Sequence, residues 1–235
     1  MVTLDMLRVS VIIPTLNEAA SVKATIDAVK ALSANIEIIV VDGGSRDATI
    51  SIAEKSGALV IDSERGRGTQ MHAGATAANG DLLWFLHADT SPSPETLGQI
   101  EETLKESDAV GGNFTIRFDG QTPAAGFMTW LYPKLRKIGL VYGDSGIFVR
   151  RDAYERVGGF KPLPLFEDVD FVRRLRRGGR FVNLSATITT SSRRFDGSSF
   201  LIMFARWSFL QVLYWLGISP YFLARFYKPI RGPKK

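Results

Sequence analysis

Cysteine is absent from the 235 residues of the chain. Disulfides, thiolate metal sites and a cysteine nucleophile are therefore excluded, and the absence agrees with a reducing compartment. The stretch from Met1 to Arg8 is short and of mixed character, so it predicts no secretory signal. We therefore expect a cytoplasmic protein, either free or held at the inner face of the cell membrane.

Acidic residues are outnumbered, with 24 Asp and Glu against 29 Lys and Arg and a formal net charge of +5. This excess favours acidic partners such as phosphates, nucleic acid or an anionic membrane surface. We do not expect nucleic-acid binding, because the arginines are dispersed and no recognised nucleic-acid motif accompanies them. With 45% hydrophobic residues, the length suits one large domain, or one domain with a substantial appendage.

Short β-branched runs alternate with helical stretches in the first half of the chain. The predicted strands cover residues 8–14, 36–42, 58–62 and 82–86, and the predicted helices cover residues 18–32, 47–56 and 69–78. Asn17 is expected to cap the first helix. This order, with its short connections, predicts an α/β fold with a doubly wound, mostly parallel sheet.

The second half is less regular, and it contains no internal repeat or low-complexity tract. Helices are predicted at residues 95–105, 151–157 and 166–177, strands at 110–118 and 181–184, and a turn followed by a strand at 143–150. The helix at 166–177 begins with carboxylates and ends with arginines, which suits the helix dipole.

The strand at 82–86 consists of five large apolar residues and ends at His87-Ala88-Asp89. Such a strand is expected to be buried on both faces and to deliver these residues to the sheet edge where ligands bind. A carboxylate there can hold Mg²⁺ or Mn²⁺ together with substrate phosphates. His87 would project to the same side as Asp89 if the strand continued. It could ligate the metal, contact a nucleotide or lie satisfied in the core.

A second acidic group, Glu167, Asp168 and Asp170, stands at the start of the helix predicted at 166–177. One interpretation is complementarity with the helix dipole. The other is a general base that removes a proton from an acceptor hydroxyl. The residues alone do not choose between the two.

Polar residues also follow the first two strands, at Pro14-Thr15-Leu16-Asn17-Glu18 and at Asp42-Gly43-Gly44. They could contact a nucleoside, or they could simply cap helices and turns. Residues 65–70, with the sequence RGRGTQ, could clamp a diphosphate, although arginines in a turn are usually only solvated. A P-loop is excluded, because no Gly-Lys-Ser/Thr follows.

The segment at 200–226 is rich in aromatic residues and has apolar side chains on every face of a helix. Three alternatives remain for it. It could be a buried or interface helix, a pair of helices that lies at the membrane surface, or a true membrane span. A span needs ~20 mainly apolar residues, whereas residues 200–216 number 17 and include one arginine. Aromatic and basic residues together favour a headgroup boundary, so we expect at most a peripheral membrane contact.

Four ordered motifs carry a resemblance to a known family. They are VSVIIPTLNE at residues 9–18, VVDGGSRD at 40–47, GDLLWFLHAD at 80–89, and Glu167-Asp168. In this order they resemble the family-2 inverting glycosyltransferases over roughly residues 8–180. Residues 65–74 and 85–90 resemble a compact bacterial branch of that family, which is associated with radical-SAM and selenodomain genes.

The resemblance implies a GT-A fold and a metal-dependent transfer of sugar from a nucleotide-sugar donor to an acceptor hydroxyl, with inversion. Asp168 would be the catalytic base, with Glu167 beside it, and Asp89 would bind Mg²⁺ or Mn²⁺. The residues implied for the nucleotide-sugar site are Pro14, Thr15, Glu18, Asp42, Arg67, His87 and Asp89. Asp144 would contact the acceptor, which is expected to be lipid-linked or otherwise hydrophobic. His87 departs from the family, whose motif has an aspartate at this position.

The expected division is a GT-A catalytic domain at 1–195, an aromatic helical segment at 196–228 and a basic tail at 229–235. One alternative function is nucleotidyl transfer, which makes a sugar nucleotide. That activity predicts a Gly-rich loop with a basic residue after the first strand, where this chain has Pro-Thr-Leu-Asn-Glu. Another alternative is a non-catalytic membrane-associated binding module. In that case, His87 in place of the family's aspartate would be a sign of a lost active site.

Overall fold

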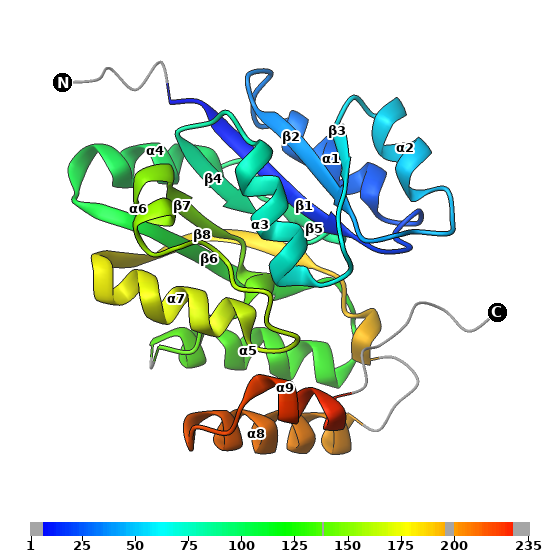
Figure 1. Ribbon diagram of the computed structural model, residues 1–235, viewed down its shortest axis with the longest axis vertical. Helices are drawn as coiled ribbons and strands as arrows, with labels where there is room; N and C mark the ends of the chain where they lie inside the picture. The colour runs from blue at the N-terminus through cyan, green and yellow to red at the C-terminus, as the bar shows by residue number, and fades with distance from the viewer. Residues whose placement is uncertain (1–6, 138, 196–199, 228–235) are drawn as a thin grey trace.

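The computed structural model describes residues 7–137, 139–195 and 200–227. Its centre is an eight-stranded sheet with the strand order β3-β2-β1-β4-β7-β6-β8-β5 (Figure 1). The strands are β1 Val9–Thr15, β2 Glu37–Asp42, β3 Leu59–Asp62, β4 Leu82–Phe85, β5 Thr90–Pro92, β6 Ala109–Phe118, β7 Ile147–Arg150 and β8 Arg180–Thr190. The helices around the sheet are α1 Val22–Lys30, α2 Thr49–Lys55, α3 Arg67–Ala77, α4 Thr96–Glu106, α5 Pro123–Lys137, α6 Arg151–Arg156 and α7 Glu167–Gly178.

The first half of the sheet is parallel, as the alternating pattern predicts. β1 pairs with β2 and β4, and β2 pairs with β3, all in parallel register. Helices connect these strands, so the carboxyl ends of β1, β2 and β4 meet at one edge. The α/β class and its parallel core are thereby confirmed, and this edge is where the site residues gather.

The second half mixes directions. β7 lies between β4 and β6 and is antiparallel to both, whereas β6 and β8 are parallel. β5 is a short antiparallel strand on β8. Neither β5 nor α5 was predicted. Three residues carry too little periodicity to indicate a strand, and α5 contains Pro133, which in sequence argues against a helix interior.

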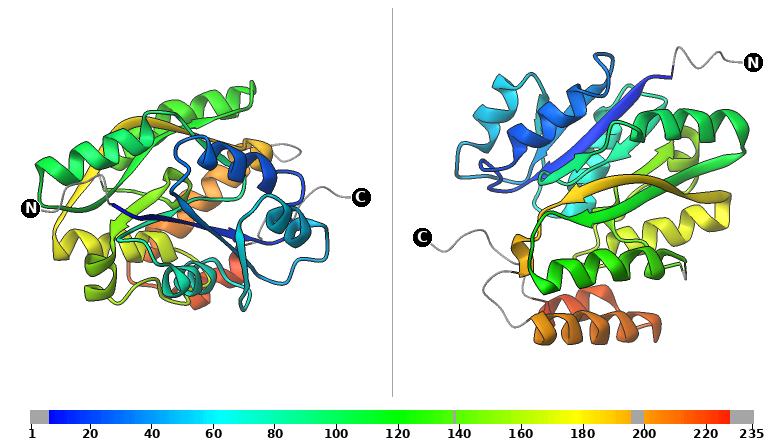
Figure 2. Two further views of the ribbon diagram at one scale, coloured as in Figure 1. Left: turned by 90° about the horizontal axis from the view of Figure 1, so that it is seen from above. Right: turned by 180° about the vertical axis from the view of Figure 1, so that it is seen from behind.

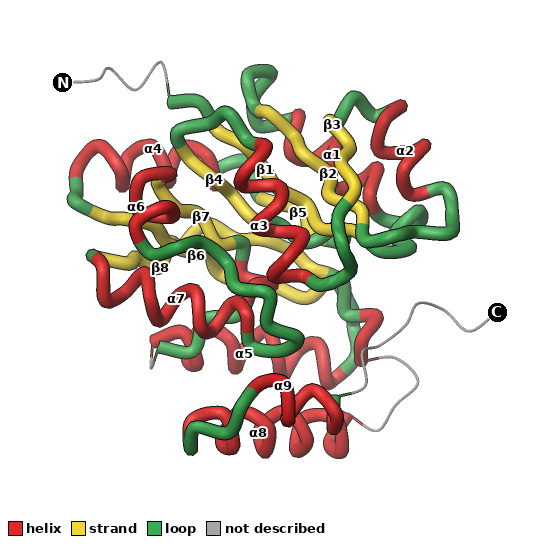
Figure 3. Tube along the Cα trace, viewed as in Figure 1, coloured by secondary structure: helices red, strands yellow, loops and turns green. Residues whose placement is uncertain are grey.

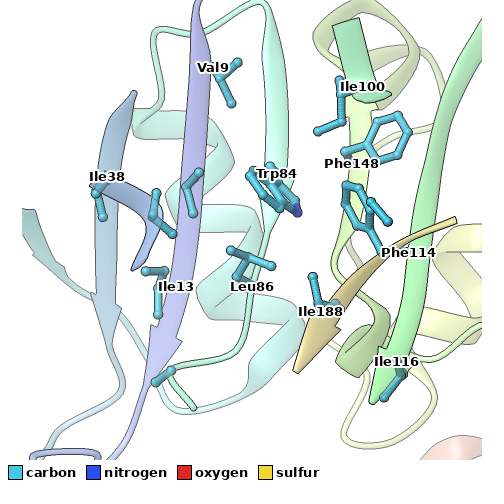
Figure 4. Packing of buried hydrophobic residues seen from close by; sticks show 14 of the residues in the cluster. Val9, Ile13, Ile38, Trp84, Leu86, Ile100, Phe114, Ile116, Phe148 and Ile188 are labelled. Atoms are coloured by element: carbon cyan, nitrogen blue, oxygen red, sulfur yellow. The ribbon is translucent and has the colours of Figure 1, made fainter. Parts of the chain in front are cut away.

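Two apolar clusters pack on opposite faces of the sheet. Trp84 and Leu82 of β4 belong to one cluster, in which Trp84 lies beside Phe114 and Phe148 (Figure 4). Leu83 and Phe85 belong to the other cluster. All four β4 residues are buried. The expectation that this strand is covered on both faces is confirmed.

Asn17 does not cap the first helix, which corrects the prediction. The helix begins at Val22, and Asn17 has a left-handed backbone with φ 57°. Its side-chain Oδ1 accepts a hydrogen bond from the Arg46 N–H at 2.8 Å, and its own N–H donates to Ser45 Oγ at 2.8 Å. Asn17 therefore ties the loop after β1 to the loop after β2.

The C-terminal segment forms a layer outside α5 and α7. It consists of α8 Phe200–Trp215 and α9 Pro220–Leu223, which lie on the side of α5 away from the sheet (Figures 1 and 2). The tube in Figure 3 shows α9 folded back beside α8. Buried Leu210 and Leu223 pack on Leu165, Phe166 and Val169 at the start of α7.

Within the described part of the chain, no helix is long and apolar enough to span a bilayer. Most of α8 is exposed or half-buried, with Leu210 and Gln211 as its buried residues. The proposed domain boundary at 195/196 and the basic tail at 229–235 fall at or within segments outside the described residues.

The close packing of α3 on the sheet leads to a stability prediction. A Cβ on Gly74 of α3 would lie against Ile12 and 2.8 Å from the Val41 side chain, whereas a Cβ on Gly98 of α4 would meet no described atom within 4 Å. We expect Gly74→Ala to lower the free energy of unfolding by about 1–3 kcal/mol, because overpacking outweighs helix propensity. Gly98→Ala, the matched control, should raise it by up to about 1 kcal/mol. Urea denaturation measures both variants. Equal changes in the free energy of unfolding would contradict the close approach of α3 to the sheet at Gly74.

Candidate active site

Arg193 bridges two of the predicted site carboxylates. Its guanidinium lies 2.5 Å from Glu18, which follows β1, and 3.3 Å from Asp89, which follows β4. Arg193 belongs to the short 3-10 turn Arg193–Phe195 after β8. The structure therefore brings Glu18 and Asp89 together at the carboxyl edge of the sheet, through a cation from the far end of the chain.

His87 and Asp89 do not share a strand, since β4 ends at Phe85. The condition under which both would project to the same side, a strand that continues to Asp89, is not met, and the two residues face different partners. His87 Nδ1 lies 2.9 Å from Asp144 Oδ1, and Arg194 lies 2.8 Å from the other Asp144 oxygen. His87 is therefore engaged by a carboxylate from another part of the chain.

Asp144 is a buried carboxylate held ionised by its neighbours. It lies in the 3-10 turn Gly143–Ser145, just before β7. Burial alone would raise the pKa of this carboxyl, but the Arg194 charge and the His87 contact hold the pKa well below its usual range. The site thus contains a fixed negative charge beside His87.

Glu167 and Asp168 open α7, and both are buried. Glu167 pairs with Arg67 at 2.6 Å, and Asp168 Oδ2 accepts a hydrogen bond from the Gly143 N–H at 2.6 Å. Gly68 permits the first contact, because a Cβ at this position would strike the Lys161 carbonyl and lie 3.2 Å from Glu167. Gly68 therefore allows α3 to approach α7 closely.

The Asp168 carboxyl is harder to ionise than an ordinary aspartate. Burial, and then the adjacent Glu167 charge, raise its pKa to about 6, although Arg67 and the Gly143 N–H act in the opposite direction. A carboxylate with such a pKa is ionised near neutral pH and still basic enough to accept a proton.

Thr15 and Asp42 organise the loops at the ends of β1 and β2. Asp42 is buried and accepts hydrogen bonds from the N–H groups of Gly44 and Ser45 at 2.8 and 2.6 Å. The Thr15 hydroxyl donates to it at 3.1 Å. Pro14 precedes Thr15 at the end of β1 and is half-buried. The Asp42 carboxylate therefore holds the turn that follows β2 through these hydrogen bonds.

Asp89 supplies a donor suited to a hard cation. Among residues 7–137, 139–195 and 200–227, no group of three or more His, Cys, Asp and Glu side chains could hold a metal by itself. Mg²⁺ and Mn²⁺ in phosphate-binding sites commonly use one or two carboxylates and complete their coordination with water and substrate phosphates. One partly accessible carboxylate opposite Arg193 fits that mode of binding.

A pocket of about 250 Å³ adjoins Asp168 and Asp144. We call it the α5–α8 pocket, because those two helices form most of its walls. Its apolar lining comes from Met128, Leu135, Leu140, Leu165, Phe166, Phe204, Trp207, Leu210, Val212 and Trp215. Its polar end holds Arg67, Asp144, Asp168 and Arg194. The buried acid thus faces a largely apolar space.

Several site groups were not identified from the sequence. In the sequence, Arg193 and Arg194 are a basic pair after the strand predicted at 181–184, which could contact phosphate or could equally be surface charge. Nothing in the sequence indicates that the Gly143 N–H or Gln211 belongs to the site. Their roles depend on hydrogen bonds with Asp168 and Tyr142, which are distant in sequence.

Known proteins resemble this chain in sequence and in fold. Residues 10–158 match the model of the family described as glycosyl transferase family 2. Glycosyltransferase AglE of Haloferax volcanii is 30% identical over 189 residues, which cover 73% of this chain and 62% of AglE. Undecaprenyl-phosphate 4-deoxy-4-formamido-L-arabinose transferase of Aeromonas hydrophila is 32% identical over 120 residues, covering 46% of this chain and 37% of that protein.

A solved structure shows the same fold. The mannosyltransferase PcManGT from Pyrobaculum calidifontis, in complex with GDP-Man and Mn²⁺, superposes with a TM-score of 0.63 at 21% identity, covering 77% of this chain and 56% of that one. The GT-A expectation is thereby confirmed. The chain spans about half the length of the curated relatives it matches.

The raised pKa of Asp168 leads to a pH-dependent stability prediction. Since the unfolded chain loses this proton near pH 4 and the folded chain near pH 6, the contribution of Asp168 to stability is lost as pH rises through 6. Asn resembles the protonated acid, so Asp168→Asn should match wild type near pH 4. At pH 8 it should be more stable by up to about 3 kcal/mol.

Asp144→Asn is the matched control. The pKa of Asp144 is lowered, so its ionised form stabilises the fold above the ordinary aspartate pKa. This variant should therefore be destabilised at pH 8. Urea titrations at pH 4 and pH 8 measure both variants. If the Asp168→Asn protein is less stable than wild type at pH 8, the ionised Asp168 carboxylate does not destabilise the fold and the prediction is contradicted.

Proposed function

Since this chain belongs to glycosyl transferase family 2, we propose that it moves a sugar from a nucleotide-sugar donor to an acceptor hydroxyl, with inversion. The observation that carries the proposal is Asp168, a buried carboxylate with a pKa of about 6 at the wall of a pocket. The sequences at 65–74 and 85–90 support a place in the compact bacterial, radical-SAM-associated branch.

Asp168 is the proposed base. Its carboxylate takes the proton of the acceptor O–H, and the acceptor oxygen forms a bond to the anomeric carbon. The bond between that carbon and the diphosphate oxygen breaks, and its electron pair leaves with the nucleoside diphosphate. The Gly143 N–H orients the Asp168 carboxylate, and the Glu167–Arg67 pair beside it keeps the local charge balanced.

The donor side of the proposal uses the edge formed by β1, β2 and β4. Pro14, Thr15, Glu18 and Asp42 would hold the nucleoside, and Arg193 would face the diphosphate. Asp89 would hold Mg²⁺ or Mn²⁺, which when bound neutralises charge on the leaving diphosphate. Support comes from the structural neighbour PcManGT, whose complex contains GDP-Man and Mn²⁺. His87, paired with Asp144, would set the position of that carboxylate near the acceptor.

A hydrophobic acceptor suits the α5–α8 pocket, since its walls are largely apolar beyond the polar end that holds Asp168. A relative from Aeromonas hydrophila is named an undecaprenyl-phosphate transferase, which supports an acceptor carried on lipid. The aromatic segment at 200–226 would then lie close to the membrane that contains the acceptor.

The outer face of α8 supports a peripheral membrane contact. We define this face by Leu201, Ile202, Phe209, Val212 and Leu216, whose exposed fractions range from 47% to 75%. Residues 200–227 contain Arg206 and Arg225 and no acidic residue. Exposed apolar side chains flanked by arginines favour an anionic lipid surface, and we propose the inner face of the cell membrane as the location.

Two variants should separate donor binding from chemistry. We expect one of UDP-, GDP-, CMP- or TDP-sugars to raise the melting temperature in a Mn²⁺-dependent manner, and Asp89→Ala to lose this shift. Asp168→Asn should keep the shift but lose about 10²–10⁴-fold in kcat, because only proton removal is affected. Thermal shift and product assays measure the two quantities.

Loss of donor affinity in Asp168→Asn comparable to its loss of turnover would contradict its role as base. If no nucleotide sugar stabilises the wild-type protein, with or without Mn²⁺, the transferase proposal fails and the non-catalytic binding module becomes the better explanation.

The membrane contact is tested with vesicles containing phosphatidylglycerol. Phe209→Glu should weaken co-sedimentation by about tenfold or more, because it removes an apolar anchor and adds a negative charge. Leu59→Glu is the matched control, since Leu59 is also 50% exposed but lies in β3, away from α8. Equal binding of the two variants would contradict the assignment of this face.

A further inference from the structure

The α5–α8 pocket has a polar end whose charges are already paired. Among the described residues that line it, the charged ones are Arg67, Arg194, Asp144 and Asp168. Arg194 pairs with Asp144, and Arg67 pairs with Glu167 just outside the lining. With Asp168 ionised, two guanidiniums face three carboxylates. The polar end therefore carries an excess of one negative charge.

This excess disfavours a phosphate as the acceptor group. A phosphate monoester brings up to two further negative charges, and like charges within a few ångströms repel strongly in a site shielded from water. A phosphate oxygen also has no proton that needs a base near neutral pH. The buried base Asp168 is of use only to a group that must lose a proton, such as a hydroxyl.

The other polar residues that line the pocket are uncharged, and they are Tyr132, Tyr142, Ser208, Gln211 and Tyr227. Gln211 of α8 is 5% exposed, and its Oε1 accepts a hydrogen bond from the Tyr142 hydroxyl at 3.0 Å. Its Nε2 has no hydrogen-bond partner among the described residues. A buried N–H without a partner is costly, and an oxygen on a neutral ligand could satisfy it.

The pocket is too small for a whole lipid. Its volume of about 250 Å³ lies below the ~300–1,000 Å³ typical of sites that enclose a drug-sized ligand. Two of its lining residues, Val212 and Trp215, are about half exposed, and Val212 also belongs to the outer face of α8. The pocket is therefore continuous with the apolar surface of this helix.

We propose that the α5–α8 pocket binds the hydroxyl-bearing end of a neutral apolar alcohol, while the rest of its chain lies along the outer face of α8. This inference rests on the proposed function, because it names the acceptor class of the same site. A neutral alcohol of this kind differs from a lipid phosphate acceptor because its reacting end carries no charge.

The test compares farnesol with farnesyl phosphate, which share one apolar chain. Binding of each to the full-length protein is measured by tryptophan fluorescence without nucleotide or metal, at pH 8, where Asp168 is ionised. We expect farnesol to bind at least about tenfold more tightly than the phosphate. Equal or tighter binding of farnesyl phosphate would overturn the proposal.

A pair of serine variants locates the binding. Ser208 of α8 and Ser51 of α2 are both exposed, but Ser208 lines the pocket and Ser51 does not. Ser208→Phe should weaken farnesol binding at least about tenfold by filling the pocket, whereas Ser51→Phe should leave it unchanged. Equal affinities in the two variants would show that farnesol binds elsewhere on the apolar surface, and the proposal would fail.

Failure of this inference is distinguishable from failure of the proposed function. The same variants are tested for the nucleotide-sugar thermal shift, which does not involve the pocket. If the nucleotide-sugar thermal shift is retained but farnesol and farnesyl phosphate bind equally well, only the proposed acceptor class is overturned. Farnesol binding that is sensitive to Ser208→Phe, in a protein that binds no nucleotide sugar, upholds the pocket and rejects the transferase.

Discussion

The side-by-side burial of Glu167 and Asp168 is the constraint on which the site depends. Two adjacent carboxylates shielded from water repel each other, and the fold tolerates them because each faces a donor. Arg67 reaches Glu167 from α3, and the Gly143 N–H reaches Asp168 from the turn before β7. The site is therefore held by contacts between segments that are distant in sequence.

Backbone geometry enforces those contacts. Gly68 lets the first turn of α3 approach Lys161 and Glu167, where a side chain would not fit. Phe166, directly before the acidic pair, has a left-handed backbone with φ 63° and stacks on Tyr214 of α8, with ring centroids 4.6 Å apart. A non-glycine residue is rarely held in this conformation without support from its surroundings. Packing of α8 thus fixes the point at which α7 begins.

The features that could be predicted from the sequence are those set by local patterns of neighbouring residues. The buried strand that leads to Asp89 and the acidic helix start at Asp168 both follow from local patterns, and the structure contains them. The sequence did not predict the partners of these groups. The contact of His87 with Asp144, the bridge made by Arg193 and the role of Asn17 between two loops arise from long-range topology. α5, with its internal proline, was missed for the same reason, since its stability comes from packing on β6.

One wall of the proposed acceptor pocket comes from a stretch of the chain separate from the strand ends that would hold the donor. The family match covers residues 10–158, which include Glu18, Asp42 and Asp89, but it ends before Asp168 and the whole of α8. The α8 wall of the pocket is thus encoded apart from the ends of β1, β2 and β4, whereas α5 and Arg193 connect the two regions. Substitutions in α8 can therefore change the acceptor during evolution while the donor edge stays intact. In this architecture, one donor chemistry can be inherited by descendants that modify very different molecules.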